Sequence, residues 1–170
     1  MSDTSITSKE VKSSSDHEII RQLKSPWKLK WFFLTKLPSC LWWGVSLKSL
    51  DANQAQIQLP YSWRTQNPFK SIYFAAQIGA GELATGLLCT IALHGKGRVS
   101  MLAIHSAAEF TKKANSLTTF TCNQGEEARA TIEKAIATKE PQTITMTAEG
   151  VQENGEVVSR IMITWSFKAK

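Results

Sequence analysis

Residues 71–95 read SIYFAAQIGAGELATGLLCTIALHG and form the longest apolar stretch of the chain. Glu82 is the single formally charged residue between Lys70 and Lys96. Because alanine, leucine and other apolar residues fill the stretch, it predicts one long helix that is apolar almost all round. Such a helix requires burial on nearly every side, and a carboxylate at its centre with no cationic neighbour on the same helix is unusual.

The stretch is long enough to cross a bilayer, but its polar residues argue against that interpretation. A carboxylate at the bilayer centre costs about 3 kcal/mol, and Gln77 adds to this cost. Patterned strands are also expected on both sides of the stretch. We therefore expect a helix buried inside a protein. Asn67 and Pro68 predict its N-cap and first residue, and the glycines of residues 94–97 predict its end.

The segment before this helix combines helix-forming composition with tryptophans and lysines. Residues 18–37 predict a helix that Pro26 divides in two. Its apolar residues are expected to form one side, and lysines are interleaved with them: Trp27, Trp31, Phe32, Leu34 and Leu37, with Lys24, Lys28, Lys30 and Lys36. A membrane-surface helix has this pattern, and so has a helix that packs on the protein and leaves its lysines in water. We favour packing.

Most of the remaining chain predicts antiparallel β-structure. Residues 45–50 and 55–59 flank a turn and predict a hairpin. After residue 97, apolar and polar residues alternate over four further segments, of which 157–167 is the clearest. Residues 126–138 interrupt them with apolar residues at helical spacing and predict a short covering helix. The order is that of an α+β protein in which an antiparallel sheet wraps around the long helix.

Length and composition limit the organisation and the partners. The chain has 170 residues and a formal net charge of +6. We expect a disordered lead over residues 1–16 and a single domain over 17–170, with a helical extension at 17–43. The basic residues are scattered and match no nucleic-acid-binding motif, so no nucleic-acid partner is expected. The start of the chain lacks the apolar core of a secretory signal, which indicates a cytoplasmic protein. The three cysteines, at 40, 89 and 122, have no metal-binding or disulfide spacing and indicate buried thiols, so no metal site is expected.

Two segments resemble a known family. Residues 67–86 read NPFKSIYFAAQIGAGELATG, and residues 107–114 read AAEFTKKA. Both resemble recurring segments of the DUF4442 group of hotdog-fold proteins, which is similar to the PaaI-like acyl-CoA thioesterases. The resemblance spans most of residues 40–168 and implies a hotdog fold, with a homodimer or a dimer of dimers.

The resemblance also implies an active site. In PaaI-like thioesterases an Asn precedes the central helix, and an acidic residue fifteen positions later is the general base or nucleophile. Asn67 and Glu82 stand at that separation. Those enzymes carry a His-Gly-Gly stretch at the start of the helix, where this chain has Tyr73, Phe74 and Ala75. These three positions are the implied place of the substrate.

The surroundings of Glu82 support the same assignment without the family. At helical spacing its neighbours include Ala75, Gly79 and Gly86, which give a narrow face that a substrate or another backbone can approach. A buried carboxylate in such surroundings has a raised pKa, which suits a general base or nucleophile. In the alternative interpretation, Glu82 hydrogen-bonds to a loop or pairs with a cation from elsewhere in the chain or from a second subunit.

Lys112 and Lys113 are candidates for binding the phosphates of coenzyme A, although a solvated strand end has the same composition. The sequence therefore predicts a hydrolase of fatty or aromatic acyl-CoA thioesters. No cofactor is expected apart from the coenzyme A carried by the substrate. A non-catalytic binder of acyl chains or lipids on the same scaffold is the alternative.

Overall fold

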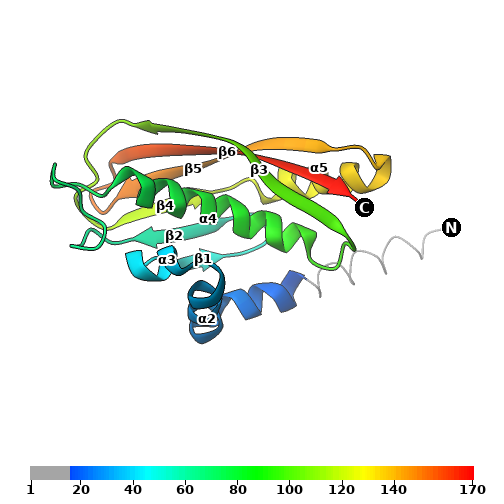
Figure 1. Ribbon diagram of the computed structural model, residues 1–170, viewed down its shortest axis with the longest axis horizontal. Coiled ribbons are helices and arrows are strands. Elements are labelled where there is room, and N and C mark those ends of the chain that lie inside the picture. The colour runs from blue at the N-terminus through cyan, green and yellow to red at the C-terminus, as the bar shows by residue number, and fades with distance from the viewer. Residues whose placement is uncertain (1–15) are drawn as a thin grey trace.

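The apolar stretch forms one long helix, as predicted. In the computed structural model, which describes residues 16–170, this helix is α4 (Phe74–Leu93). It lies along the length of the molecule (Figure 1). Within the described residues, α4 is the one helix that is long and apolar enough to cross a membrane, but 67% of its apolar window is buried inside the fold. The helix therefore belongs to the protein core.

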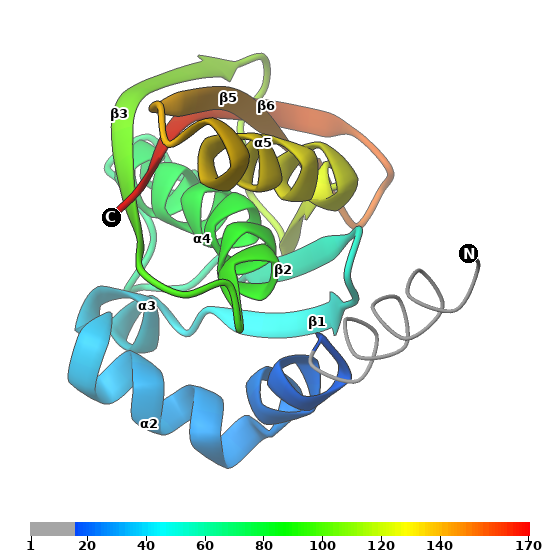
Figure 2. The ribbon, with the colours of Figure 1, turned by 90° about the vertical axis from the view of Figure 1, so that its right-hand side faces the viewer.

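Within the described part of the chain, six strands form one antiparallel sheet in the order β1-β2-β4-β5-β6-β3. Their bounds are Ser46–Leu50 for β1, Ala55–Leu59 for β2, Val99–Phe110 for β3, Thr118–Cys122 for β4, Gln142–Gln152 for β5 and Val157–Ala169 for β6. Figure 2 shows the sheet curving from β1 and β2 below α4 to β5 and β6 above it. An antiparallel sheet wrapped around a central helix is the hotdog fold, and the predicted α+β class is confirmed.

Alternation along the strands places one side chain in two against α4. The inward residues of β2 and β6 include Ile57, Ile161 and Phe167, each at most 2% exposed. Gly81 lets the helix approach the sheet closely, because a Cβ at this position would lie 2.6 Å from the Cβ of Ile161. The sheet therefore encloses α4 at van der Waals distance.

The last helix, α5 (Gly125–Thr138), packs against α4, β5 and β6. Lys96, just beyond α4, donates to Glu133 of α5 at 2.8 Å. This ion pair joins the end of the central helix to the covering helix.

The chain before the sheet is helical over residues 16–24, α2 (Pro26–Lys36) and α3 (Pro38–Trp43). The expected disordered lead, residues 1–16, lies outside the described residues except for Asp16, which pairs with Arg129 at 2.9 Å. Pro26 opens α2, as predicted.

The predicted apolar side of α2 was wrong. Leu29 and Phe33, one turn apart, face the body and are 7% and 2% exposed. The residues expected to pack are instead largely exposed, apart from the half-buried Leu37: Trp27, Trp31, Phe32 and Leu34. Because α2 carries apolar residues on opposite faces, only one of these faces can contact the body.

The predicted start of the long helix was also wrong. Asn67 and Pro68 lie in a turn, and α4 begins six residues after Pro68, at Phe74. The Asn67 side chain accepts hydrogen bonds from the backbone N–H groups of Phe69 and Ser71, at 3.0 and 3.2 Å. These bonds hold the turn in place of a helix, as Asx side chains commonly do.

Candidate functional site

Glu82 lies near the middle of α4 on the part of the helix that the sheet leaves open. It is half-buried, and so are the residues at helical spacing on the same face, Ala75, Ile78, Gly79 and Gly86. The remaining faces of α4 are mostly buried. The carboxylate therefore lies in a narrow stripe of small and aliphatic residues that reaches solvent.

Residues from α3 and β6 border this carboxylate. The indole of Trp165 on β6 lies against Gly86, and so does the Glu82 carboxylate, because each has an atom 3.5 Å from where a Cβ of Gly86 would stand. Trp165 Nε1 donates to Thr85 Oγ1 at 3.1 Å, and Thr85 Oγ1 donates to the Glu82 carbonyl at 2.9 Å. These two bonds fix the indole beside the helix turn that carries Glu82.

Burial sets the ionisation of this region. It raises the pKa of Glu82 above its ordinary value. Burial, with a smaller contribution from the negative charge of Glu82, raises the pKa of the Cys40 thiol on α3 to about 11. The pKa of Cys89 is also raised, by burial first, then by Cys122 and by Glu82. All three cysteines are buried and free, as predicted, and thiols this weakly acidic are not nucleophiles at neutral pH.

The carboxylate has no charge partner within the described residues. The four ion pairs found there involve Asp16, Glu133, Glu149 and Glu156. Of the side-chain hydrogen bonds found there, the one that involves Glu82 is donated by Thr85 to its backbone carbonyl and leaves the carboxylate without a partner. Among residues 16–170, Glu82 therefore combines burial, solvent contact and an uncompensated charge, a combination typical of functional carboxylates.

Asn67 does not contact Glu82. Besides the two backbone bonds above, its Oδ1 accepts from the Ser71 hydroxyl at 3.2 Å. Glu82 lies eight residues into a helix that begins after this turn, about 12 Å along its axis. The two residues are thus at separate places in one chain.

The start of α4 has aromatic side chains at its surface and backbone N–H groups without an acceptor among the described residues. The rings of Tyr73 and Phe74 lie 4.7 Å apart, and the Phe74 ring lies 6.3 Å from that of Phe110 on β3. Tyr73 donates its N–H to Thr65 O at 2.7 Å. The N–H groups of Phe74 and Ala75 have no acceptor among the described residues, as is usual for the first turn of a helix.

Asn67, Phe74, Lys112 and Lys113 meet around one cavity of about 440 Å³ at the start of α4. Lys112 pairs with Glu156, and Lys113 Nζ donates to Phe69 O at 3.3 Å. The structure therefore brings four of the predicted site residues together. Glu82 and Gly79 lie further along the helix.

Gly79 is covered by an element that sequence reasoning did not connect with the site. A Cβ at Gly79 would lie 2.7 Å from the Trp43 ring of α3. Trp43, Cys40 and Trp165 border the Glu82 region but were not predicted. No local pattern signals these contacts, because the three residues come from elements distant in sequence. Thr85 also borders the region, and its helical spacing from Glu82 predicts that contact.

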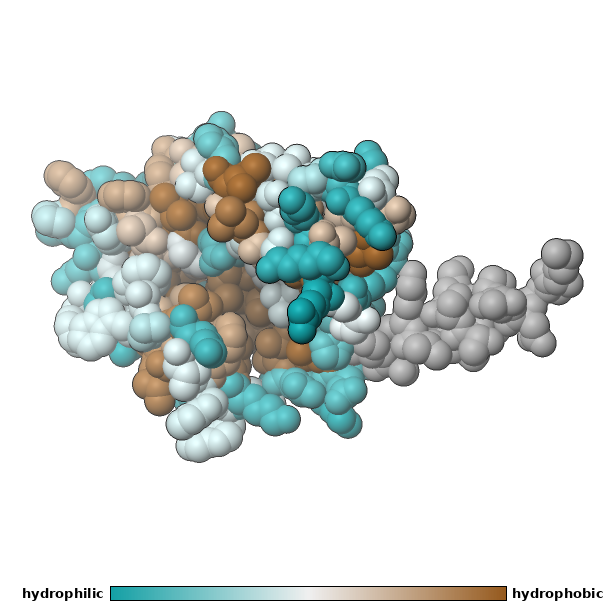
Figure 3. Space-filling view, turned by 45° about the vertical axis from the view of Figure 1, so that its right-hand side comes forward, coloured by the Kyte–Doolittle hydropathy of each residue, from teal (hydrophilic) through white to brown (hydrophobic). Residues whose placement is uncertain are grey.

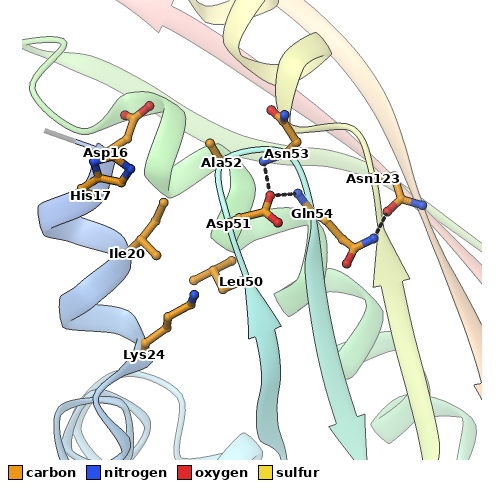
Figure 4. Close-up of a pocket in the computed structure, with 10 residues that line it drawn as sticks. All are labelled: Asp16, His17, Ile20, Lys24, Leu50, Asp51, Ala52, Asn53, Gln54 and Asn123. Atoms are coloured by element: carbon orange, nitrogen blue, oxygen red, sulfur yellow. Dashed lines mark hydrogen bonds between the residues drawn. The ribbon is translucent and has the colours of Figure 1, made fainter. Parts of the chain in front are cut away.

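A larger cavity, of about 810 Å³, lies between helical residues 16–24 and the turn of the first hairpin. Figure 4 shows its lining, with Asp51 accepting from the backbone N–H groups of Asn53 and Gln54 at 2.8 Å each. Asp16, the other carboxylate, pairs with Arg129. Both carboxylates of this cavity have structural partners, which distinguishes them from Glu82.

Comparison with known families identifies the family of this chain. Residues 25–167 match the model of a domain of unknown function, DUF4442. The chain belongs to the DUF4442 family. A comparison with curated proteins found no match.

Solved structures share the fold at low sequence identity. A probable thioesterase from Pseudomonas aeruginosa is 15% identical, with a TM-score of 0.71 over 85% of this chain and 97% of that one. A protein of unknown function from Chlorobaculum tepidum is 14% identical, with a TM-score of 0.72 over 84% and 93% of the two chains. A thioesterase from Haemophilus influenzae is 14% identical, with a TM-score of 0.60 over 79% and 85%. These likenesses confirm that the DUF4442 chain has the fold of hotdog proteins.

The raised pKa of Glu82 predicts a specific dependence of stability on pH. The folded protein keeps the Glu82 proton to a higher pH than the unfolded chain does. Protonation of Glu82 therefore contributes fully to the free energy of unfolding below about pH 4.5, and this contribution is lost as the pH rises through the pKa of the folded state. Glu82→Gln keeps a neutral side chain of the same shape. We expect it to have a higher free energy of unfolding than the wild type at pH 7, and an equal one near pH 4, in urea denaturation.

Glu140→Gln is the matched control, because Glu140 is exposed. It should match the wild type at both pH values. A Glu82→Gln protein that is less stable than the wild type at pH 7 would show that a cation pairs with the carboxylate, and would contradict this account.

Proposed function

We propose that this DUF4442 protein hydrolyses acyl-CoA thioesters, with Glu82 as the catalytic carboxylate. The observation that carries the proposal is a carboxylate with no charge partner among residues 16–170, half-buried on an apolar helix and bordered by glycines. Desolvation makes such a carboxylate a stronger base than one in water. The names of the similar structures from P. aeruginosa and H. influenzae support the same reaction class.

The reaction needs a base or nucleophile and a donor to the carbonyl oxygen. Glu82 accepts a proton from water as the water oxygen attacks the thioester carbon, or its own oxygen attacks that carbon and water then cleaves the resulting anhydride. In the first route Glu82 passes that proton to the sulfur as the carbon–sulfur bond breaks, and the thiol of coenzyme A leaves. In the second route the thiolate leaves as the anhydride forms and takes up a proton from solvent. Water then cleaves the anhydride to the carboxylic acid, returning a proton to solvent and restoring the Glu82 carboxylate. In this proposal the N–H groups of Phe74 and Ala75, which have no acceptor among the described residues, stabilise the oxyanion at the positive end of the α4 dipole.

One chain cannot bring these groups to the same carbonyl, because Glu82 and Phe74 are about 12 Å apart along the helix axis. A second copy with its α4 antiparallel to the first removes this difficulty. If the two helices cross near Ile78, Glu82 of one copy lies next to Phe74 of the other. The half-buried stripe on α4 has the small residues that such close packing needs.

The edge strand β3 supports a second copy independently. It is twelve residues long and pairs along one side with β6, leaving its other side at the sheet edge. Leu102 and Ile104 are 64% and 52% exposed there. A long, apolar, unpaired edge is normally covered, and pairing with the same strand of a second copy covers it. We therefore propose a homodimer.

The cavity at the start of α4 fits the nucleotide end of the substrate. Lys112 and Lys113 line it and supply cations for phosphates, and Phe74 and Phe110 supply an apolar wall. From this cavity the extended pantetheine arm runs along the stripe toward the reacting carbonyl. This arrangement gives Lys112, Lys113, Phe74 and Ala75 successive positions along one bound substrate.

The first test is an assay of hydrolysis with a panel of acyl-CoAs, in which the released thiol of coenzyme A is measured. We expect Glu82→Gln to lower kcat/KM by about 10²- to 10⁴-fold, the usual range for loss of a general base. Glu140→Gln, an exposed carboxylate outside the site, should retain wild-type turnover. Comparable hydrolysis by Glu82→Gln would refute the assignment. Tight acyl-CoA binding without turnover by the wild type would favour the non-catalytic binder.

The second test asks whether the site is shared between copies. Phe74→Pro removes one N–H donor where proline is tolerated, since it is the first helical residue and Tyr73 before it is extended, at φ −59° and ψ 132°. Phe74→Ala removes the same ring but keeps the N–H, and should be the more active variant. Mixed dimers of Phe74→Pro with Glu82→Gln, isolated by two affinity tags, contain one intact site of two and should show about half of the wild-type activity. Mixed dimers no more active than either variant alone would contradict a shared site.

A further inference from the structure

The outward face of α2 is apolar where a helix that only packs on its protein would be polar. Trp27, Trp31 and Leu34 are 79%, 63% and 54% exposed, and their spacing of four and three residues places them on one face. This face, which we call the tryptophan face, lies opposite the buried residues Leu29 and Phe33. Figure 1 shows α2 below the sheet and away from the edge strand β3.

The tryptophan face contains a shallow cavity. Trp27, Trp31, Leu34 and Leu41 line a cavity of about 300 Å³, together with Lys30. The lower part of Figure 3, where α2 lies in Figure 1, shows apolar and near-neutral side chains next to hydrophilic ones. Its composition is that of helices that lie in a lipid–water interface, where tryptophan rings sit at headgroup level and lysines reach the headgroups.

The excess positive charge of the chain lies on this segment. Residues 19–50 contain six Lys or Arg residues and no Asp or Glu. The other fourteen basic residues of the chain are matched by fourteen acidic ones. Lys28, Lys30 and Lys36 of α2 are exposed and form no ion pair within residues 16–170. The segment 19–50, which contains the exposed tryptophans of α2, therefore carries an excess of six positive charges, equal to the net charge of the chain.

A second cavity next to the tryptophan face has the same chemistry. It measures about 400 Å³ and is lined by Lys24, Lys30 and Arg64 together with apolar residues that include Phe33 and Leu41. Three cations beside an apolar lining fit an anionic amphiphile, with the phosphate on the cations and the chain on the apolar side chains. Lys30 and Leu41 border both cavities.

We infer that the tryptophan face docks this protein on the surface of a membrane that contains anionic lipids. The rings of Trp27 and Trp31 enter the interface, and the lysines of α2 contact the headgroups. The inference does not depend on the proposed hydrolysis.

Sedimentation of the full chain with vesicles tests this inference. One set of vesicles contains phosphatidylcholine alone and the other phosphatidylcholine with phosphatidylserine. We expect the wild type to bind the anionic set at least about tenfold more tightly, and to lose this preference in high salt. Absence of binding to anionic vesicles, or equal binding to both sets, would overturn the inference.

Matched variants identify the surface. Trp27→Ser with Trp31→Ser should weaken binding to anionic vesicles at least about tenfold, since partitioning follows the apolar area inserted. Phe69→Ser, which removes an aromatic residue 73% exposed elsewhere, should bind as the wild type does. Equal recovery of all three proteins with the vesicles would overturn the inference. A change of oligomeric state in the tryptophan variant without vesicles would also overturn it, because this face would then be a subunit contact.

Charge reversal gives a second readout that does not depend on how the tryptophan variant folds. Lys28→Glu with Lys30→Glu should lower binding to anionic vesicles by about tenfold or more, given the contribution of each basic residue near a charged surface. Lys134→Glu with Lys168→Glu changes the net charge equally on exposed residues of α5 and β6, and should lower binding less. Equal losses in the two pairs would show that net charge alone decides binding and would overturn the docking surface.

Discussion

The desolvation of one carboxylate on the central helix is the constraint on which this structure depends. The sheet encloses α4 so closely that Gly81 has no room for a side chain, and it leaves open only a stripe of small residues around Glu82. An ionised carboxylate in that position lowers the stability of the fold, whereas a neutral side chain there would not. The raised pKa of Glu82 is the physical expression of that cost, and in the proposed reaction it would make the carboxylate a stronger base.

The same constraint underlies the proposal of a second copy. The hotdog arrangement buries α4 on the sheet side and leaves the other side half-open, and it ends in a long unpaired strand, β3. Helix geometry separates Glu82 from the free N–H groups at the start of α4 within one chain. Two antiparallel copies would bring the carboxylate of one to the helix start of the other. The proposed dimer would account for both the unpaired edge strand β3 and the proposed chemistry.

The sequence predicted the fold well, because α4 and the strands are encoded by local periodicity and composition. It failed where an unpatterned contact decides the outcome. The turn held by Asn67 delays the start of α4, and a capping pattern looks the same as an Asx turn in sequence. The tryptophans of α2 were assigned to the core because periodicity cannot tell which of two apolar faces points inward. Cys40 and Trp165 reach Glu82 from distant parts of the chain, so no local pattern announces them.

The dependence of kcat/KM on pH tests the central claim most directly, because it reports the ionisation of the free enzyme's essential groups. If ionised Glu82 performs the reaction, kcat/KM for an acyl-CoA rises with pH through an apparent pKa above 4.5 and then levels off. The residual activity of Glu82→Gln lacks this rise. A profile that is flat from acid to neutral pH, or the same rise in Glu82→Gln, would contradict the claim.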